Sequence, residues 1–242
     1  MHSFLEFHIK EAYNKGQEYE RKLVGELHSK KLGKVGILSG RGNDAFVHLA
    51  NGKTYKMGIK ADDAAAGQVQ FGRDESGWKY ETKDKQGQHL VNTLHSLGAH
   101  GSLEDHYGST KGKTKSHHID HVRGVHKKKG ELHVPVIGNQ HQLSKVLYHG
   151  MNRDHLVHIK GKGTYAMTPK IAKETGIDYI GDRMNSDADP VSIRHRVKTH
   201  SSAKKGKPAV RSLTAQLNLN TDALENSDHS IVLHGLKRKE DV

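Results

Sequence analysis

The chain has 242 residues, and its 39 lysines and arginines outnumber 27 aspartates and glutamates, which gives a net charge of +12 near neutral pH. It has no cysteine, so disulfides and thiolate metal sites are excluded. It has neither a run of about 18 apolar residues nor an apolar signal-like start, so a cytoplasmic protein without a membrane partner is expected. The basic surplus favours a polyanionic partner, and nucleic acid is the usual one.

The first predicted element is a helix over residues 3–31, interrupted near Gly16. Glu20 precedes Leu23 and Val24 by three and four positions, so it shares their apolar face rather than the solvated one. A carboxylate in that position either pairs with a lysine at the rim of the core or belongs to a functional site.

Residues 43–71 contain the strongest local signal in the chain. Asp44 opens an alternating run, an Asn-Gly turn follows, and a second alternating run ends on Lys60. This pattern predicts a β-hairpin with a carboxylate on one arm and a lysine on the other. On the second arm, alternation places Lys60 and Gly58 on one face, away from Ile59.

The remaining elements predict a mixed α/β or α+β fold. Residues 61–68 are expected to be an irregular or helical link, and the glycine-, lysine- and histidine-rich residues 101–131 a mobile basic loop. A helix is expected at 90–100, and another at 168–176, where Thr168 is the N-cap and Gly176 the stop. Strands are expected at 34–38, 69–72, 78–81, 134–138, 155–161, 164–167, 191–200 and 212–220.

Three side chains have the chemistry of a metal-dependent phosphodiesterase. Mg²⁺ takes oxygen ligands and uses few protein carboxylates, which Asp44 and Glu20 can provide. Such an ion polarises a phosphate and ionises a water, and Lys60 can orient that water or stabilise the developing charge. The spacing alone also fits an ordinary surface hairpin that carries an aspartate and a lysine.

The helix with Glu20, the segment NDAFVHL and the segment GIK together resemble the core of the PD-(D/E)XK nucleases. The resemblance covers residues 15–81 and implies a restriction-endonuclease-like fold, a mixed sheet flanked by helices. It implies that Asp44 and Glu20 bind Mg²⁺ or Mn²⁺, that Lys60 is the catalytic lysine, and that the protein cleaves DNA. The Gly-Gln pair ending at Gln68 is similar to that of phage-type members, so Gln68 is expected to line the site. Many relatives act as dimers.

One position departs from the pattern of this family. Two residues before the lysine, the family has Glu or Asp, and this chain has Gly58. Three interpretations follow: Asp62 or Asp63 supplies the missing oxygen, the chain is an inactive variant, or it is a relative that binds DNA without cutting it. The last interpretation corresponds to a non-catalytic DNA-binding or phage structural protein, and an RNA-processing nuclease is a third possibility.

Histidines cluster at residues 116–126, where His117, His118, Asp120 and His121 have the residue types of a zinc site. A ββα-metal nuclease uses such residues, but its further Asn and His have no clear match here. A basic, pH-sensitive loop near phosphate is the alternative.

Glycine-interleaved basic segments recur in the second half of the chain, and they predict contacts with the backbone of duplex DNA. The alternative is a solvated loop surface. The residues expected to contact nucleic acid are Lys127, Lys128, Lys129, Arg194, Arg196, Lys204 and Lys205. The expected organisation is a nuclease-like core over 1–100 and a basic, strand-rich extension over 101–242, packed as one unit with it.

Overall fold

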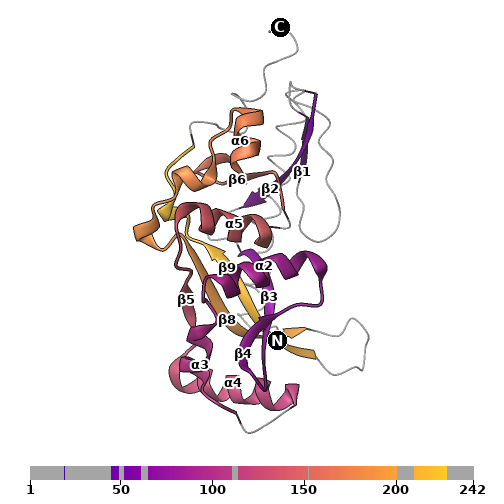
Figure 1. Ribbon diagram of the computed structural model, residues 1–242, viewed down its shortest axis with the longest axis vertical. Helices are drawn as coiled ribbons and strands as arrows, with labels where there is room; N and C mark the ends of the chain where they lie inside the picture. The colour runs from indigo at the N-terminus through magenta and orange to yellow at the C-terminus, as the bar shows by residue number, and fades with distance from the viewer. Residues whose placement is uncertain are drawn as a thin grey trace, which may run out of the picture. The chain divides into compact units, whose positions relative to one another are not determined.

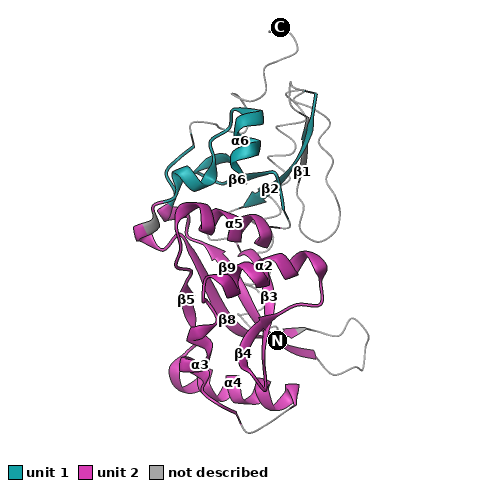
Figure 2. Ribbon diagram, in the orientation of Figure 1, with its two compact units in different colours: residues 1–64, 153–184, 224–242 teal, residues 65–152, 185–223 magenta. Residues whose placement is uncertain are grey.

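The computed structural model describes Tyr19 and residues 45–48, 52–60, 65–110, 114–151, 153–200 and 210–227 (Figure 1). The chain forms two compact units, each built from separate stretches of sequence (Figure 2). Unit 1 comprises 1–64, 153–184 and 224–242, and unit 2 comprises 65–152 and 185–223, so the chain passes between the units four times. The expected boundary at residue 100 falls inside unit 2.

Unit 1 contains a four-stranded sheet of strand order β1-β2-β6-β7. Its strands are β1 (Ala45–His48), β2 (Thr54–Lys60), β6 (Leu156–Ile159) and β7 (Gly163–Ala166). The hairpin of β1 and β2 confirms the prediction, with Ala45 opposite Met57. β2 also pairs in parallel with β6, a pairing between segments about 100 residues apart that no local pattern indicates.

Alternation along β2 separates an apolar face from a polar one. Tyr55, Met57 and Ile59 are buried in a cluster with Leu156, and Tyr19 packs against that cluster. Tyr19 is helical and is the one described residue of the helix expected at 3–31. Lys56, Gly58 and Lys60 therefore lie on the opposite face of the strand, as expected.

Helix α6 (Pro169–Thr175) of unit 1 confirms the predicted helix with its caps. Thr168 accepts a hydrogen bond from the Ile171 backbone N–H at 3.3 Å, and Gly176 ends the helix in the left-handed conformation. Residues 224–227 close the unit, because Tyr165 donates to the Glu225 carbonyl (2.8 Å) and Ser227 donates to that of Thr164 (2.7 Å).

Because that threonine satisfies an N–H at the start of the helix, we expect Thr168→Ala to lower the free energy of unfolding by about 1 kcal/mol. Urea denaturation followed by circular dichroism measures the loss. Thr168→Ser keeps the accepting oxygen and should stay close to the parent. An equal loss in both variants would show that the cap does not stabilise the helix.

Unit 2 contains a five-stranded sheet of strand order β4-β3-β9-β8-β5. Its strands are β3 (Ala65–Asp74), β4 (Gly77–Glu81), β5 (His133–Pro135), β8 (Val191–His200) and β9 (Val210–Leu219), all paired antiparallel. The strands β3, β4, β8 and β9 confirm those expected at 69–72, 78–81, 191–200 and 212–220. Residues 65–68, expected as part of a link, belong instead to β3, which extends its pairing with β9.

The described helices of unit 2 cover one face of this sheet. They are α2 (Lys85–Ser96), α3 (Gly101–Tyr107), α4 (Lys115–Lys129) and α5 (Gln140–Gly150). Phe71 and Trp78 of the sheet lie 5.7 and 5.4 Å from the Tyr107 ring of α3, between ring centroids. The aromatic core of unit 2 therefore lies between this sheet face and the helices.

The expectation of a mobile loop over 101–131 was wrong, because this stretch forms α3 and α4. Ile119 and Val122 of α4 are buried, and Thr114 caps the helix by accepting from the His117 backbone N–H. Two apolar positions three residues apart are enough to bury one face of a helix whose other positions are basic. Short 3₁₀ helices complete the described elements: Ile180–Arg183, Ser186–Ala188 and Thr221–Ala223.

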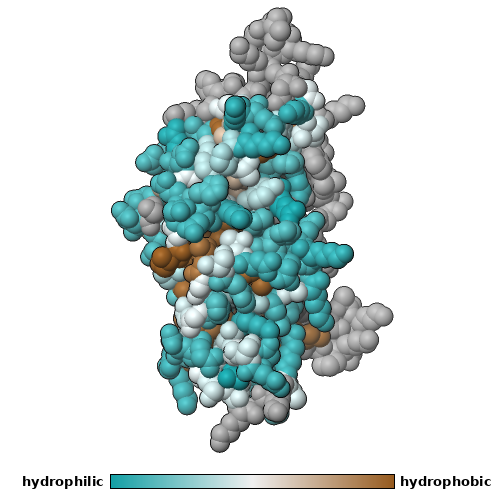
Figure 3. All heavy atoms as spheres, in the orientation of Figure 1, coloured by the Kyte–Doolittle hydropathy of each residue, from teal (hydrophilic) through white to brown (hydrophobic). Residues whose placement is uncertain are grey.

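The visible surface is mostly hydrophilic (Figure 3). Among the described residues, the large apolar side chains that are strongly exposed are Ile137 and Val210. None of the helices within the described ranges is long and apolar enough to cross a membrane.

Candidate active site

The polar face of β2 carries a side chain that comes from another part of the sequence. Asp154 precedes β6, the parallel neighbour of β2, and its carboxylate lies over Gly58. A Cβ atom added at Gly58 would lie 2.6 Å from Asp154 Oδ2, closer than such atoms approach in proteins. The space that a side chain at position 58 would occupy is therefore filled by a carboxylate from residue 154.

Asp154 forms an ion pair with Lys56 on the same face, with Oδ1 and Nζ 3.1 Å apart. The Asp154 side chain is 2% exposed and the Lys56 side chain 21% exposed. A carboxylate this deeply buried requires a charged partner, because removal from water alone would favour its neutral form. Lys60 lies two residues beyond Gly58 on this face, and the described residues offer no hydrogen-bond or ion-pair partner to its ammonium group.

His155 fixes the chain next to this carboxylate. The ring Nδ1 of His155 accepts a hydrogen bond from the Lys56 backbone N–H at 3.0 Å. The backbone N–H of His155 donates to the Lys56 backbone carbonyl at 2.9 Å. Burial, and then the charge of Lys56, lower the pKa of His155. A lowered pKa favours the neutral ring, and only a neutral ring has an unprotonated Nδ1 that can accept this hydrogen bond.

A second buried histidine lies on the opposite face of the sheet. His158 Nε2 is 2.8 Å from the Tyr19 hydroxyl, and its Nδ1 is 3.2 Å from Thr164 Oγ1. Burial lowers the pKa of His158 to about 4, so the ring is neutral at physiological pH. Lys160 Nζ lies 5.7 Å from the centroid of the Tyr19 ring. These contacts hold the helix residue on the sheet rather than forming a reactive centre.

The structure places two of the four predicted catalytic residues, and they lie in different units. Lys60 ends β2 in unit 1, whereas Gln68 lies on β3 in unit 2. Asp44, Glu20 and Asp62 lie outside the described residues, so their roles stay predictions. β1 begins at Ala45, one residue after Asp44, and Ala45 is paired with Met57 of β2.

Sequence reasoning missed Asp154 as a candidate. The residue lies in a short polar segment, Asn-Arg-Asp, that signals a turn, and a single aspartate there carries no signal of chemistry. An aspartate two positions before a buried apolar strand was the available clue. Linking it to Gly58 requires the pairing of β2 with β6.

The predicted nucleic-acid residues are divided between elements of unit 2. Lys127, Lys128 and Lys129 are exposed in the last turn of α4, where cations also stabilise the helix dipole. Arg194 and Arg196 lie on β8, and Arg194 Nε forms an ion pair with Glu131. Lys204 and Lys205 lie outside the described residues.

The histidine cluster of 116–126 lies on helix α4, where its rings pack rather than converge. His118 packs against Trp78 with ring centroids 5.7 Å apart, and His121 Nε2 is 2.7 Å from the Tyr107 carbonyl. His126 Nε2 is 2.9 Å from the Tyr107 hydroxyl. Within the described ranges, no three His, Asp or Glu side chains are grouped as a metal site.

Comparison with known proteins gives no assignment. No family model and no curated protein matches this sequence. One solved structure is similar, HhaI endonuclease in complex with DNA at pH 6.0, with 12% sequence identity and a TM-score of 0.39. The match covers 84% of this chain and 88% of that chain. A likeness at this TM-score does not establish a shared fold.

Proposed function

We propose that the protein is a metal-dependent DNA nuclease in which Asp154 provides the carboxylate that position 58 lacks. The observation that supports this proposal is the overlap of the Asp154 carboxylate with the space above Gly58. The acid and Lys60 then belong to one face of the sheet, although they come from strands that are distant in sequence.

The polar face of β2 provides one of the carboxylate ligands that a magnesium ion needs. Mg²⁺ needs one or two protein carboxylates and completes its coordination with water and phosphate oxygens. Asp154 is one such ligand, and Asp44, Glu20 or Asp62 would be the second. When bound, the ion would polarise the scissile phosphate and lower the pKa of a water molecule.

The side chains of this face would have different roles. Lys60 would hold a phosphate oxygen or the attacking water through its ammonium group. Lys56 would act as a positioning residue, because it holds Asp154 at 3.1 Å in a buried ion pair. The role of Gln68 in cleavage stays a prediction, and the residue belongs to β3 of unit 2.

Nicking of a supercoiled plasmid with Mg²⁺ or Mn²⁺ tests the proposal. We expect metal-dependent nicking by the parent chain and at least a tenfold slower rate for Asp154→Asn and for Lys60→Ala. Lys53→Ala is a matched control, because Lys53 is an exposed lysine of the same hairpin that pairs with Glu174 instead. Nicking that survives in both variants, or that does not need metal, would reject the proposal.

A second candidate function is DNA binding without cleavage. Lys56 already neutralises Asp154, which is buried, and the described residues contain no group of three metal ligands. Isothermal titration with Mn²⁺ separates the two functions. Binding that disappears in Asp154→Asn supports the nuclease, whereas DNA binding with no metal uptake supports the second candidate.

A further inference from the structure

The second face of the unit 2 sheet is polar and carries none of the described helices. Its residues alternate with the apolar residues of the helix-covered face, because successive side chains of a strand point to opposite sides. On β3 these are Gln68 and Gln70, and both are exposed. The pairing registers place Thr214 of β9 between Gln70 and Arg196, and Ser212 opposite Lys198.

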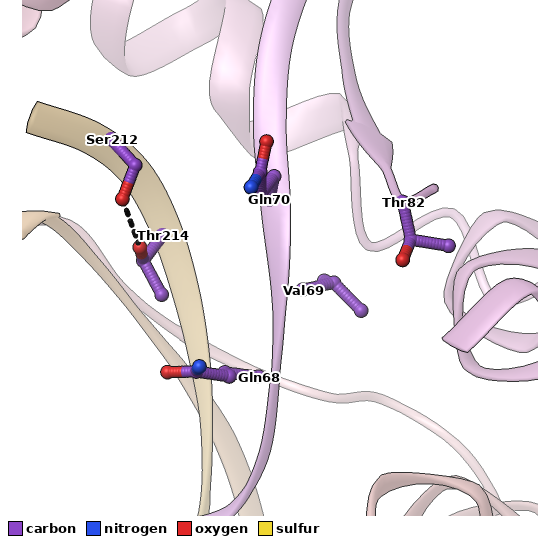
Figure 4. A pocket seen from close by; sticks show the side chains of 6 residues that line it. All are labelled: Gln68, Val69, Gln70, Thr82, Ser212 and Thr214. Carbon is purple, nitrogen blue, oxygen red and sulfur yellow. Dashed lines mark hydrogen bonds between the residues drawn. The ribbon is translucent and has the colours of Figure 1, made fainter. Parts of the chain in front are cut away.

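A pocket of about 180 Å³ lies beside β3, near the end of its pairing with β4, and Gln68 and Gln70 of the polar face contribute to its lining. Figure 4 shows the Gln68 side chain reaching toward β9, and Ser212 and Thr214 joined by a hydrogen bond of 3.3 Å. Its lining consists of Gln68, Val69, Gln70, Thr82, Ser212 and Thr214. The exposed polar groups of the pocket are the carboxamides of Gln68 and Gln70, which donate and accept hydrogen bonds without charge. The hydroxyls of Ser212 and Thr214 are buried, and Thr82 Oγ1 accepts from the Asp84 backbone N–H at 3.1 Å.

Cations border the pocket on the β8 side. Lys198 Nζ lies 3.4 Å from Gln68 Oε1, and Arg196 Nη1 lies 3.3 Å from Gln216 Oε1. Within the described residues, Arg196 and Lys198 have no carboxylate partner, whereas Arg194 pairs with Glu131. The neutral hydrogen-bonding pocket thus has positive charge on its β8 side, where a phosphate would bind, and the exposed carboxylate of Glu81, opposite Gln70 in the register, on its β4 side.

The shape of the sheet decides which form of nucleic acid fits. Adjacent strands lie about 4.8 Å apart, so five strands span roughly 19 Å between the outer two. The major groove of B-DNA is about 12 Å wide and admits a ribbon of two strands rather than a sheet of five. We therefore expect a base that projects from its strand to reach the pocket more readily than a paired one.

The same face limits how such a base is held. The aromatic side chains Phe71, Trp78 and Tyr80 of this sheet all pack on the helix-covered face. Base stacking on aromatic rings, the usual source of affinity for single strands, is therefore not available from them. Hydrogen bonds must carry the recognition, and a glutamine carboxamide best matches adenine, which presents an amine next to a ring nitrogen.

We propose that the pocket between β3 and β9 binds an unpaired adenine nucleotide of a DNA strand. Gln68 and Gln70 hydrogen-bond the base, and Arg196 and Lys198 contact the flanking phosphates. All of these residues belong to unit 2, and the proposed binding does not depend on cleavage.

Fluorescence anisotropy with labelled oligonucleotides in EDTA tests the assignment without any metal-dependent reaction. We expect the parent to bind single-stranded oligo(dA) at least fivefold more tightly than oligo(dT), and an unlabelled duplex to compete at least fivefold less well than the single strand. Gln70→Ala and Gln68→Ala should each reduce oligo(dA) affinity about tenfold and leave oligo(dT) nearly unchanged. Gln86→Ala, at an exposed glutamine of α2, should match the parent.

Lys198→Ala should weaken the binding of all sequences alike and lower the slope of log affinity against log salt by about one. Circular dichroism and thermal melting confirm that each variant is folded. Equal affinity of the parent for oligo(dA) and oligo(dT), a uniform loss in Gln70→Ala, or full competition by duplex would overturn the proposal. Failure of plasmid nicking would leave these binding results unaffected, so the two sites are tested separately.

Discussion

Gly58→Glu, the change that restores the acidic residue of the family pattern, should destabilise the protein by about 3–5 kcal/mol. The new Cβ would lie 2.6 Å from Asp154 Oδ2, and the new carboxylate would face a buried carboxylate of the same charge. Asp154 would have to move away from Lys56, which breaks a buried ion pair. Because folded proteins are stable by only about 5–15 kcal/mol, urea denaturation should show a large shift of the midpoint.

The double variant Gly58→Glu/Asp154→Ala distinguishes this cause from a general intolerance of the strand. It moves the carboxylate from residue 154 to residue 58, so we expect at least half of the lost free energy of unfolding to return. A double-mutant cycle gives the coupling free energy between the two positions. Gly124→Glu is the control, because a Cβ at Gly124 of α4 meets no atom within 4 Å. Additive losses in the cycle would contradict the exchange of carboxylates.

Stability should fall steeply as the pH is lowered from about 6.5 to 4. Burial lowers the pKa of His195 and of His158 to about 4, whereas an unfolded histidine titrates near 6.5. Between these values the unfolded chain binds protons that the folded chain does not, so the folded state loses stability as the pH decreases. Each histidine lowers the free energy of unfolding by about 3 kcal/mol at most, and this loss is complete below pH 4.

Urea titrations at several pH values between 7.5 and 4.5 measure this dependence. His195 stacks on Tyr80 and is 3.1 Å from its hydroxyl, so His195→Gln should lower stability at pH 7.5 but flatten the dependence on pH. His89→Gln, at an exposed position of α2, should keep the slope of the parent. Hydrogen bonds from Lys53 and Tyr55 lower the pKa of Glu174. Protonation of this carboxylate therefore reduces the free energy of unfolding only at more acidic pH. A slope unchanged in His195→Gln would contradict the role of this histidine.

Local sequence signals predicted the hairpin of β1 and β2 and the capped helix α6. The Asn-Gly turn between alternating runs specifies β1 and β2, and Thr168 with Gly176 specifies the ends of α6. These signals are contained in a few consecutive residues, so no distant part of the chain changes them. The opposite holds for α4, whose lysines, histidines and glycine resemble a loop until Ile119 and Val122 are seen to be buried.

The candidate site was predictable only in part, because it depends on a long-range pairing. The face shared by Lys60 and Gly58 follows from strand alternation, but the parallel neighbour that brings Asp154 to that face does not. Parallel strands need a crossover connection, and here residues 61–155 separate the two strands. The apparent defect at Gly58 is therefore understood only once the sheet is complete.

The interleaved order of the two units has a consequence for synthesis on the ribosome. The sheet of unit 2 lacks β9, which lies between β3 and β8, until residue 219 has been translated, and unit 1 lacks its closing hydrogen bonds until Ser227. Neither unit can be cut out as one continuous fragment. The nascent polypeptide must therefore keep both partial sheets from pairing with other chains until Ser227 has been translated. A chaperone that binds exposed strands would raise the yield of native protein.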